Sequence, residues 1–589
     1  MSLSQPVVMF FSPYAGIWQH AMPEALVAGA LQRQGAKVVY AVCDGMYSEG
    51  CYTMSAFGVT AVSDENTRQR VCHRCRTQRD LLVEQLDVDT ILIDDLLDGQ
   101  IMILIESIMK EVTIENLETY QYEGFAIGRY AMHEVILHHK LTSLSEITEV
   151  SLIDFRLKLK HVLMTYFVGK RLLDKVSPNR VVIYNTHPST NYTLMNLAER
   201  NKIPTYGLHA GGNMSDRLAT LYVFRQDMVL LYQDWMRRFI QSWSAQPATE
   251  LGIKNATQHF LALTAGKTVW VYSEPKSEEH LDVKKYFNIR KDQNILLATL
   301  SSYDEMYSGQ MMGMMGTYPL IFPTQVEWMR EIISFMRKRA DLFLLIRVHP
   351  RELPNRRDSI HSTHAKMLAD ELQNLPDNVR INWPSDGISL YDLIPQVDVG
   401  LNGWSSAGKE LSMLGVPVVI YTKDILFYPH TLNILATDRK NYFECIENAL
   451  HDGWSIERVK QVYRWLTVEY TLGTISIEDR FSSNEGGRSL WHRFLNRVGS
   501  HIQRHEAKNV RVPLKEECKL ALVILNEATV VDLQLAGQQR LGEKEEMVMI
   551  LAEIGKILST VYPNIPNGHS KTIDSLRKAV ANSEATIGS

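Results

Sequence analysis

The chain of 589 residues has few cysteines, no long apolar run and no large excess of either charge. Six cysteines are too few for a scaffold held by disulfides. No apolar run approaches the roughly 18 residues that a membrane helix needs, and the N-terminus lacks the basic region of a signal peptide. A net charge of -5 argues against nucleic acid as a partner. The sequence therefore predicts a cytoplasmic protein, with at most peripheral contact with the inner membrane.

Motifs of several common sites are also absent. The turn SPYAG at Ser12–Gly16 is not the GxGxxG of a dinucleotide site, and no GxxxxGK[ST] phosphate loop occurs. His133, Glu134 and His138 are spaced as His-Glu-x-x-x-His and not as HExxH. These absences exclude an NAD site of the usual kind, a P-loop and a zincin metal site.

Short apolar segments alternate with helical patterns through the first half of the chain. Val7–Ser12, Lys37–Val42, Thr90–Asp95 and Arg180–Asn185 are strand candidates. Helices are expected between them, at about 20–34 and 145–173 for example. The alternation predicts a Rossmann-like α/β unit.

Glycines and polar residues follow the predicted strands of this first unit. Tyr14 and Gly16 follow the first strand, and Gly212 follows a strand expected near Lys202–Leu208. Ligands of open parallel sheets bind at the carboxyl ends of the strands. We therefore expect Tyr14, Gly16 and Gly212 to line a cleft.

The second half holds further strand candidates at Thr268–Tyr272, at Asn294–Thr299 and within Leu342–Asp424. We expect three regions. The first is an N-terminal Rossmann-like domain at 1–255 with a cysteine-containing insertion at about 43–76, and the second is a C-terminal Rossmann-like domain at 265–480. The third is a helical extension with a flexible tail at 481–589. Two such domains that face one another enclose an interdomain cleft, a common place for a small-molecule site.

The stretch Leu342–Asp424 carries the clearest pattern of a binding site. Arg347 and His349 lie just past an apolar strand candidate and are donors that suit phosphate. A helix expected from Ala407 would offer free N–H groups to the same phosphate, and a glutamate one turn into it can accept hydrogen bonds from a ribose diol. The remaining residues assigned to this site are Ser405, Ser406, Glu410 and, past the preceding strand, Ser301.

Each of these residues also has a purely structural interpretation. His349 precedes a proline and can simply end a strand, Ser405 and Ser406 can cap a helix, and Glu410 can be an exposed helix charge. Together, however, they favour a nucleotide diphosphate or monophosphate ester as the ligand.

Four of the six cysteines lie close together in the sequence, at Cys43, Cys51, Cys72 and Cys75. The last two form a C-x-x-C pair, which is half of a usual zinc site, whereas the first two are spaced more widely than usual. The pattern predicts a possible structural zinc that fastens the insertion. The alternative is that Cys43 is simply buried and that the C-x-x-C pair lies on a basic helix.

Two segments resemble a known family: IRVHPRE at Ile346–Glu352, and SDGISLYDLIPQVDVGLNGWSSAGKELSMLGVPVVIY at Ser385–Tyr421. They resemble the donor domain of GT-B glycosyltransferases, in particular the bacterial capsule-polysaccharide-biosynthesis group. That group includes the Kdo transferases of capsule assembly and is related to glycerophosphotransferases of teichoic acid synthesis. The resemblance implies that His349 and one of the two serines contact donor phosphate and that Glu410 contacts the nucleotide.

The same resemblance implies that the N-terminal half binds the acceptor and supplies the catalytic base. His187, His209 and Glu134 are the candidates, in that order. The expected reaction transfers a sugar from a CMP- or UDP-linked donor to a hydroxyl of a glycan, lipid-linked or protein acceptor. It would serve bacterial surface polysaccharide or glycoconjugate synthesis and require no cofactor for catalysis.

Two other functions remain open from the sequence. The first is a nucleotide-sugar epimerase or hydrolase on the same fold, which would need paired carboxylates in the cleft, with Asp94, Asp95 and Glu134 as candidates. The second is a non-enzymatic glycan-assembly protein, which would bind no nucleotide.

Overall fold

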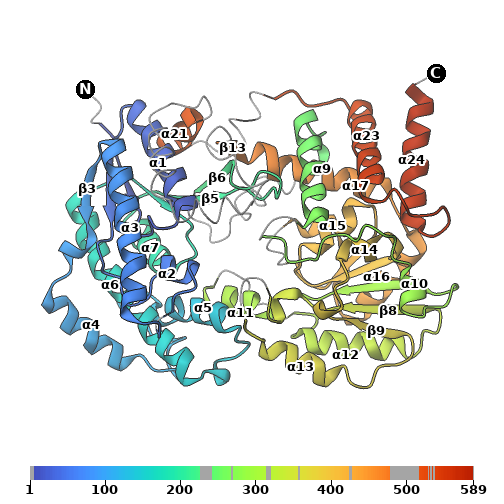
Figure 1. Ribbon diagram of the computed structural model, residues 1–589, viewed down its shortest axis with the longest axis horizontal. Helices are drawn as coiled ribbons and strands as arrows, with labels where there is room; N and C mark the ends of the chain where they lie inside the picture. The colour runs from blue at the N-terminus through green and yellow to red at the C-terminus, as the bar shows by residue number, and fades with distance from the viewer. Residues whose placement is uncertain are drawn as a thin grey trace.

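The computed structural model describes two α/β units that stand side by side (Figure 1). The described residues are 5–60, 62–225, 242–266, 270–313, 320–355, 359–423, 428–477, 517–527, 530, 534 and 538–587. Residues 481–516 of the extension predicted at 481–589 lie outside them.

The first unit is built on a seven-stranded sheet with the order β13-β6-β5-β4-β1-β2-β3. Strands β1 to β5 pair in parallel, whereas β6 and β13 are antiparallel to their neighbours. The apolar, β-branched segments form the central strands because both faces of the sheet are covered by helices. The strands are β1 (Val7–Phe11), β2 (Lys37–Val42), β3 (Asp89–Leu92), β4 (Arg180–Tyr184), β5 (Thr205–Ala210), β6 (Thr220–Arg225) and β13 (Thr474–Ser476).

The helices of the first unit begin at clear capping residues. Asp64, Asp98 and Thr148 each accept a hydrogen bond from a backbone N–H of the first turn that follows them. The predicted strand Thr90–Asp95 is shorter than expected, because a 3-10 turn occupies Ile93–Leu96. The helices are α1 (Trp18–Arg33), α2 (Tyr52–Ala56), α3 (Glu65–Leu86), α4 (Gly99–Glu111), α5 (Ile127–His139), α6 (Glu149–Val176) and α7 (Ser189–Arg200).

The second unit has a six-stranded parallel sheet with the order β12-β11-β10-β7-β8-β9. Its strands are β7 (Asn294–Thr299), β8 (Leu342–Arg347), β9 (Val379–Asn382), β10 (Val399–Asn402), β11 (Val418–Ile420) and β12 (Ile434–Leu435). The prediction of a strand at Thr268–Tyr272 is wrong for the part that the structure describes, because Trp270–Tyr272 forms no strand. The parallel second sheet and the mainly parallel first sheet confirm the predicted α/β fold of two Rossmann-like domains.

Helices on both faces complete the second unit. They are α9 (Glu250–Ala265), α10 (Val283–Tyr286), α11 (Tyr303–Met311), α12 (Gln325–Met336), α13 (Thr363–Glu371), α14 (Leu390–Leu393), α15 (Ala407–Met413), α16 (Arg439–Asp452), α17 (Ile456–Thr467), α23 (Glu543–Val561) and α24 (Lys571–Ile587). Helix α24 runs to Ile587, so most of the tail predicted to be flexible is helical. No described helix is both long and apolar enough to cross a membrane.

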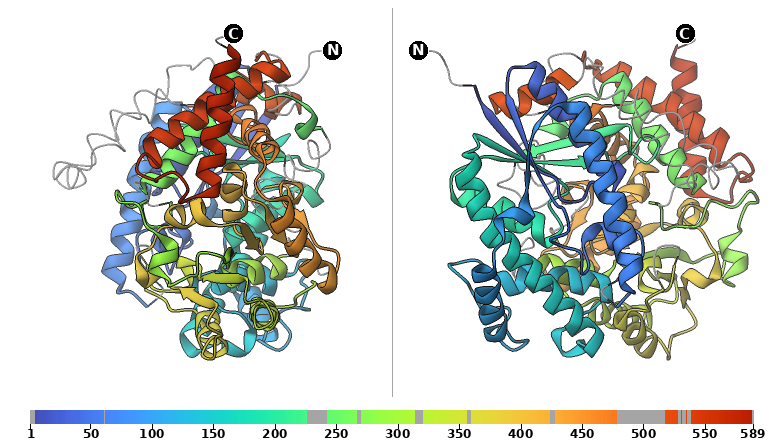
Figure 2. Two further views of the ribbon diagram at one scale, coloured as in Figure 1. Left: turned by 90° about the vertical axis from the view of Figure 1, so that its right-hand side faces the viewer. Right: turned by 60° about the vertical axis from the view of Figure 1, so that its left-hand side comes forward.

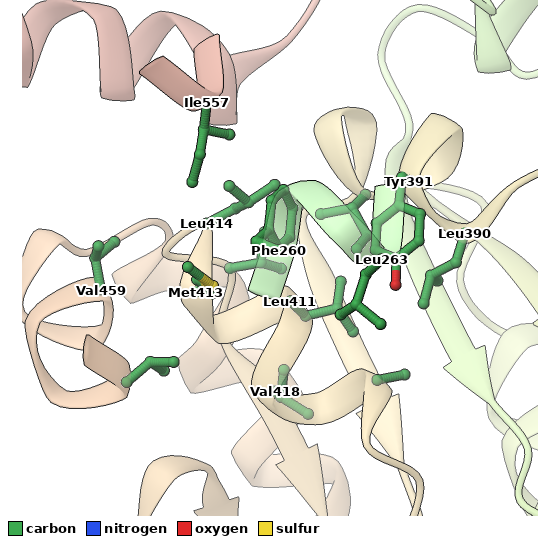
Figure 3. Close-up of a cluster of buried hydrophobic side chains, with 14 of the residues drawn as sticks. Phe260, Leu263, Leu390, Tyr391, Leu411, Met413, Leu414, Val418, Val459 and Ile557 are labelled. Atoms are coloured by element: carbon green, nitrogen blue, oxygen red, sulfur yellow. The ribbon is translucent and has the colours of Figure 1, made fainter. Parts of the chain in front are cut away.

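The domain boundaries differ from the predicted ones at both ends of the second unit. Figure 3 shows Phe260 and Leu263 of α9 packed with Leu411 and Leu414 of the second unit, and with Ile557 of α23. Helix α9 therefore belongs to the second unit. After α17 the chain crosses back, and β13 joins the first sheet beside β6 (Figure 1). Helix α9 thus packs in the second unit and β13 pairs in the first sheet, so the chain connects the two units at both places.

A second connection lies at α5 and α11, which pack against each other between the units (Figure 1). The Arg129 guanidinium of α5 donates to the carbonyl oxygen of Gln310 at 3.0 Å. The Arg351 guanidinium donates to the Leu137 carbonyl at 3.0 Å and pairs with Asp304 at 2.6 Å. Arg351 follows the His349–Pro350 pair directly, so the loop that holds His349 is fastened to the first unit. Figure 2 shows the two units from two further directions.

The packing around α15 gives a test of this architecture. A Cβ atom on Gly408 would meet the hydroxyl of Tyr428, the amide of Asn402 and the side-chain oxygen of Asn433. Gly408→Ala should therefore cost about 1–3 kcal/mol of unfolding free energy, as other overpacked sites do. Gly99→Ala, at the start of α4 with nothing within 4 Å of its Cβ position, is the control. Equal unfolding midpoints for the two variants would contradict the packing described here.

Candidate functional site

Two adjoining cavities lie between the units, at the carboxyl ends of strands from both sheets. The smaller one, of about 150 Å³, is lined only by the second unit and by Met214. The larger one, of about 340 Å³, is lined by both units. His349, Ser405, Ser406 and Glu410 line both cavities. The sequence prediction of a ligand site at these strand ends agrees with this placement.

Most residues predicted for the site come together here. Arg347, at the end of β8, lines the smaller cavity, and Ser301, past β7, lines the larger one. His187, His209 and Gly212 face them from the first unit.

Arg347 is a buried cation held only by neutral groups. It is 7% exposed. Its Nη1 donates to the Ile388 carbonyl at 2.9 Å and to the side-chain oxygen of Asn382, and its Nη2 donates to Ser273 Oγ at 3.3 Å. Within the described part of the chain, no carboxylate pairs with it. Burial lowers the pKa of Arg347 to about 10, so the side chain is still charged at neutral pH. A buried charge without a partner is costly, and an anion in the adjoining cavity would compensate it.

His349 presents a hydrogen-bond donor to the same cavity. Its Nδ1 accepts from the backbone N–H of Arg351 at 3.2 Å, so the proton of the neutral ring must be on Nε2. Burial lowers the pKa of His349 to about 4. At neutral pH the ring is therefore a neutral donor, a suitable partner for a phosphate oxygen.

Glu410 lies one turn into α15 and is also buried. Tyr391 donates its hydroxyl to one carboxyl oxygen at 2.9 Å, and Ser406 Oγ donates to the other at 3.0 Å. Burial raises the pKa of Glu410. Each oxygen keeps a second lone pair, so the carboxyl can accept a further bond from a ligand hydroxyl.

The N-terminus of α15 contributes less to anion binding than the sequence predicted. Helix α15 has seven residues, and the Ser405 hydroxyl already accepts from the backbone N–H of Ala407 at 3.3 Å. The Ser406 hydroxyl bonds to Glu410 and caps no backbone group. The charge for an anion therefore comes from Arg347 more than from the helix N-terminus.

On the opposite wall, His209 has the other tautomer. Its Nδ1 lies 2.9 Å from the Ala210 carbonyl oxygen, which can only accept, so the proton is on Nδ1. Nε2 is left with a lone pair. Burial, helped by the charge of Arg217, lowers the pKa of His209 to about 3. Burial also lowers the pKa of His187, whose backbone N–H donates to Asn185 Oδ1 at 3.0 Å.

Glu134, the third candidate for the catalytic base, does not line either cavity. Its carboxylate is buried, lies 2.7 Å from Lys158 Nζ and accepts from the backbone and hydroxyl of Ser189. Lys158 and nearby histidines outweigh burial and lower the pKa of Glu134. This geometry gives Glu134 a structural role, and its assignment as a base loses support.

Tyr14 and Gly16 also lie away from the two cavities. The Tyr14 ring is buried, and its hydroxyl contacts Thr190. A Cβ atom on Gly16 would meet the side chains of Thr53 and Cys75. Of the three residues predicted to line the acceptor side, only Gly212 does so.

A group of polar residues lies on the segment from α17 to β13, which we call the crossing segment, and was not predicted from the sequence. After α17 the chain forms a π-helical turn at Val468–Leu472, a feature often found at functional sites. Glu469 and Tyr470 of this turn line the larger cavity. Lys409 Nζ lies 3.1 Å from the Glu469 carboxylate, and the Tyr470 hydroxyl lies 3.1 Å from His259 Nε2. No sequence signal marks a π-turn.

The four predicted metal-ligand cysteines line a separate cavity of about 20 Å³ in the first unit. Cys75 Sγ accepts from the backbone N–H of Gly16 at 3.2 Å, and burial raises the pKa of Cys75 to about 12. Among the described residues, no three His, Cys, Asp or Glu side chains converge closely enough to hold a metal ion. The structural zinc stays a prediction, and this geometry supplies no ligand set for it.

Comparison with known proteins finds distant structural likenesses only. No family model matches the chain, and no curated protein matches it. Among solved structures, a KpsC β-Kdo 2,4-transferase of Thermosulfurimonas dismutans is 14% identical, with 52% of this chain and 83% of that chain covered at a TM-score of 0.33. A UDP-GlcNAc 2-epimerase of Neisseria meningitidis is 12% identical, with 82% and 100% covered at a TM-score of 0.27.

A putative UDP-N-acetylglucosamine 2-epimerase of Listeria monocytogenes is 11% identical, with 82% of this chain and 96% of that chain covered at a TM-score of 0.27. These similar structures have the GT-B fold, in which two Rossmann-like domains face each other. The chain shows this fold by its own sheet order and by its crossing segment. At such low identities and TM-scores the likeness assigns no activity, so the function is inferred from the site itself.

The neutral state of His209 can be tested through the pH dependence of stability. Its pKa is about 3 in the folded chain, against about 6.5 when unfolded. The unfolded state therefore binds the extra proton first as the pH falls. The contribution of neutral His209 to the free energy of unfolding is therefore fully present above about pH 6.5. It is lost as the pH falls toward 3, by up to about 1.4 kcal/mol per pH unit.

His209→Gln should make this loss shallower in denaturant titrations between pH 7.5 and 5. His451→Gln, at an exposed helix end, serves as the control and should leave the slope unchanged. Equal slopes for wild type and His209→Gln would mean that His209 is not held neutral by burial.

Proposed function

We propose that the chain is a glycosyltransferase that moves a sugar from a nucleotide-sugar donor to a hydroxyl acceptor. The observation that carries this proposal is the buried Arg347, which lacks a carboxylate partner in the described chain and lies beside the donor face of His349. A phosphate group satisfies both: it brings negative charge to Arg347 and an acceptor oxygen to His349 Nε2.

The reaction that follows needs a base opposite the phosphate. His209 Nε2 takes the proton of the acceptor hydroxyl, whose oxygen then attacks the anomeric carbon of the sugar. The bond from that carbon to the phosphate oxygen breaks, and its electron pair leaves with the nucleotide. Arg347 and His349 stabilise the negative charge that develops there. His187 lines the same cavity and is the alternative base. The mechanism requires no metal ion or cofactor for this step.

The biological setting follows only from the resemblance stated for the sequence. We propose CMP- or UDP-linked sugars as donors and a glycan, lipid-linked or protein acceptor. Surface polysaccharide or glycoconjugate synthesis in a bacterium is the proposed process. A cytoplasmic location, with at most peripheral contact with the inner membrane, would give access to such donors.

A nucleotide-sugar epimerase or hydrolase is the second candidate, and one observation favours it. The carboxylates first considered for it do not line the two cavities, and Asp94 instead accepts from the backbone N–H of Asp44 at 2.6 Å. Glu305, Glu410 and Glu469 line the larger cavity in their place. Three carboxyl groups therefore line the cavity in which a nucleotide sugar would bind. A non-enzymatic glycan-assembly protein is the third candidate and would bind no nucleotide.

Nucleotide binding is the first property to test. A ligand that binds only the folded state raises the unfolding midpoint by mass action. We expect one of CMP, CDP, UDP, GDP and ADP to raise the midpoint of the wild type, and His349→Ala to reduce this rise at the same ligand concentration. No rise with any nucleotide would favour the non-enzymatic alternative.

The catalytic step is tested by His209→Ala. This variant should bind the nucleotide as the wild type does, while donor turnover falls by roughly 10²- to 10⁴-fold, the usual contribution of a general base. His187→Ala is the matched variant on the same wall. A larger loss of turnover in His187→Ala than in His209→Ala would make His187 the catalytic base instead of His209. Turnover of the nucleotide sugar without any acceptor, unaffected by added glycosides, would instead support the epimerase or hydrolase.

A further inference from the structure

The C-terminal pair of helices packs beside the donor side of the cavity. Helices α23 and α24 contact each other, and α23 also packs on α9 (Figure 1). The link between them, residues 562–570, points into the second unit, with Tyr562 1% exposed and Ile565 4% exposed. We call α23, the link and α24 the C-terminal hairpin.

One short segment lies between this hairpin and the cavity. It comprises residues 388–396 and includes α14. At one end, the Ile388 carbonyl accepts from Arg347 Nη1 at 2.9 Å. In its middle, the Tyr391 hydroxyl donates to Glu410 at 2.9 Å. The segment thus contacts two charged residues of the cavity, and we call it the orienting segment.

The orienting segment is held from two sides. On one side is the stretch before β7, where Ser389 Oγ donates to the Glu274 carbonyl at 2.7 Å and Ser273 Oγ accepts from the Leu390 N–H at 3.2 Å. On the other side is the hairpin. The Tyr562 hydroxyl donates to the Tyr391 carbonyl at 3.2 Å, and Ser570 Oγ donates to the Pro395 carbonyl.

Charged groups reinforce the contact with the hairpin. Lys571 Nζ lies 2.9 Å from the Asp398 carboxylate, just past the orienting segment. Lys276 Nζ lies 3.4 Å from the Asp392 carboxylate and 5.9 Å from the centre of the Tyr562 ring. Lys276 and Asp392 are both largely buried, so this pair is screened less than a surface pair. The hairpin therefore bonds to the backbone of Tyr391, which lines the smaller cavity, and again to the backbone of Pro395.

We infer that the C-terminal hairpin supports the donor pocket from behind the orienting segment, and that Tyr562 is a positioning residue that acts through Tyr391 on Glu410 and through the rest of the segment on Arg347. This inference rests on the proposed nucleotide-sugar function, because nucleotide affinity is its readout. The Tyr562 hydroxyl holds the backbone of Tyr391 in place. The position of that backbone in turn sets the position of the Tyr391 hydroxyl, which donates to Glu410. The same segment fixes the carbonyl that orients the Arg347 guanidinium.

A side chain that only adds stability would behave differently from a positioning residue. Tyr562→Phe keeps the ring and removes only the bond to the Tyr391 carbonyl. We expect it to weaken binding of the nucleotide that the wild type prefers by roughly fivefold in calorimetry, the effect of losing about one hydrogen bond. Ser570→Ala, which removes the second bond of the hairpin to the orienting segment, should weaken binding in the same direction.

Tyr442→Phe is the matched control. Tyr442 is fully buried in the same unit, and its hydroxyl accepts from Trp328 Nε1 at 2.9 Å on the far side of the sheet from the hairpin core. It should lower the unfolding midpoint and leave the nucleotide Kd unchanged. A loss of affinity in Tyr442→Phe equal to that in Tyr562→Phe would reduce the role of the hairpin to general stability.

A double-mutant cycle tests the route through Tyr391. Tyr391→Phe should itself weaken nucleotide binding, and adding Tyr562→Phe should weaken it little further, because both changes act on one contact chain. Full additivity, or an unchanged Kd in Tyr562→Phe, would overturn the inference while leaving the proposed function intact. If the wild type binds no nucleotide, the proposed function fails and the inference fails with it.

Discussion

The site depends on a single buried charge. Arg347 ends a central strand of the second sheet and is surrounded by an amide, a hydroxyl and a backbone carbonyl. These neutral groups satisfy its hydrogen bonds and fix its direction, but they do not neutralise it. The carboxyls of Glu410 and Asp392 act on it only at a distance. The fold therefore bears the desolvation cost of a cation whose best partner is a ligand anion, which is the property that separates a binding site from a structural ion pair.

The crossing segment joins the two halves of this site. Helix α17 packs on α9 in the second unit, the π-turn brings Glu469 to the cavity, and β13 ends in the first sheet. The buried pair of Lys409 and Glu469 bonds this segment to α15, the helix that carries Glu410. The crossing segment therefore contributes to the packing of both units and to the wall of the cavity.

The sequence predicted where the residues of the second half of the candidate site lie, because these residues follow strand ends in chain order. Arg347, His349 and Glu410 could be located from strand periodicity alone, since parallel strands bring their carboxyl ends to one edge. The first half was predicted less well. Tyr14 follows a strand end and Glu134 lies within α5, but both are turned into the core, where they contact Thr190 and Lys158, which are distant in sequence. Glu469 was missed because a π-turn depends on tertiary packing and leaves no periodic signal.

His209 and His349, two of the histidines that line the larger cavity, show how the backbone can set opposite chemical roles on opposite walls. Burial keeps both rings neutral at pH 7, so their hydrogen-bond partners alone decide which nitrogen carries the proton. A carbonyl beside His209 leaves a lone pair facing the cavity, and an N–H group beside His349 leaves a donor facing it. One wall can therefore accept a proton while the other receives negative charge. This polarity supports the proposed transfer of a group from the second unit toward an acceptor on the first, without a change in the ionisation of either ring before the reaction starts.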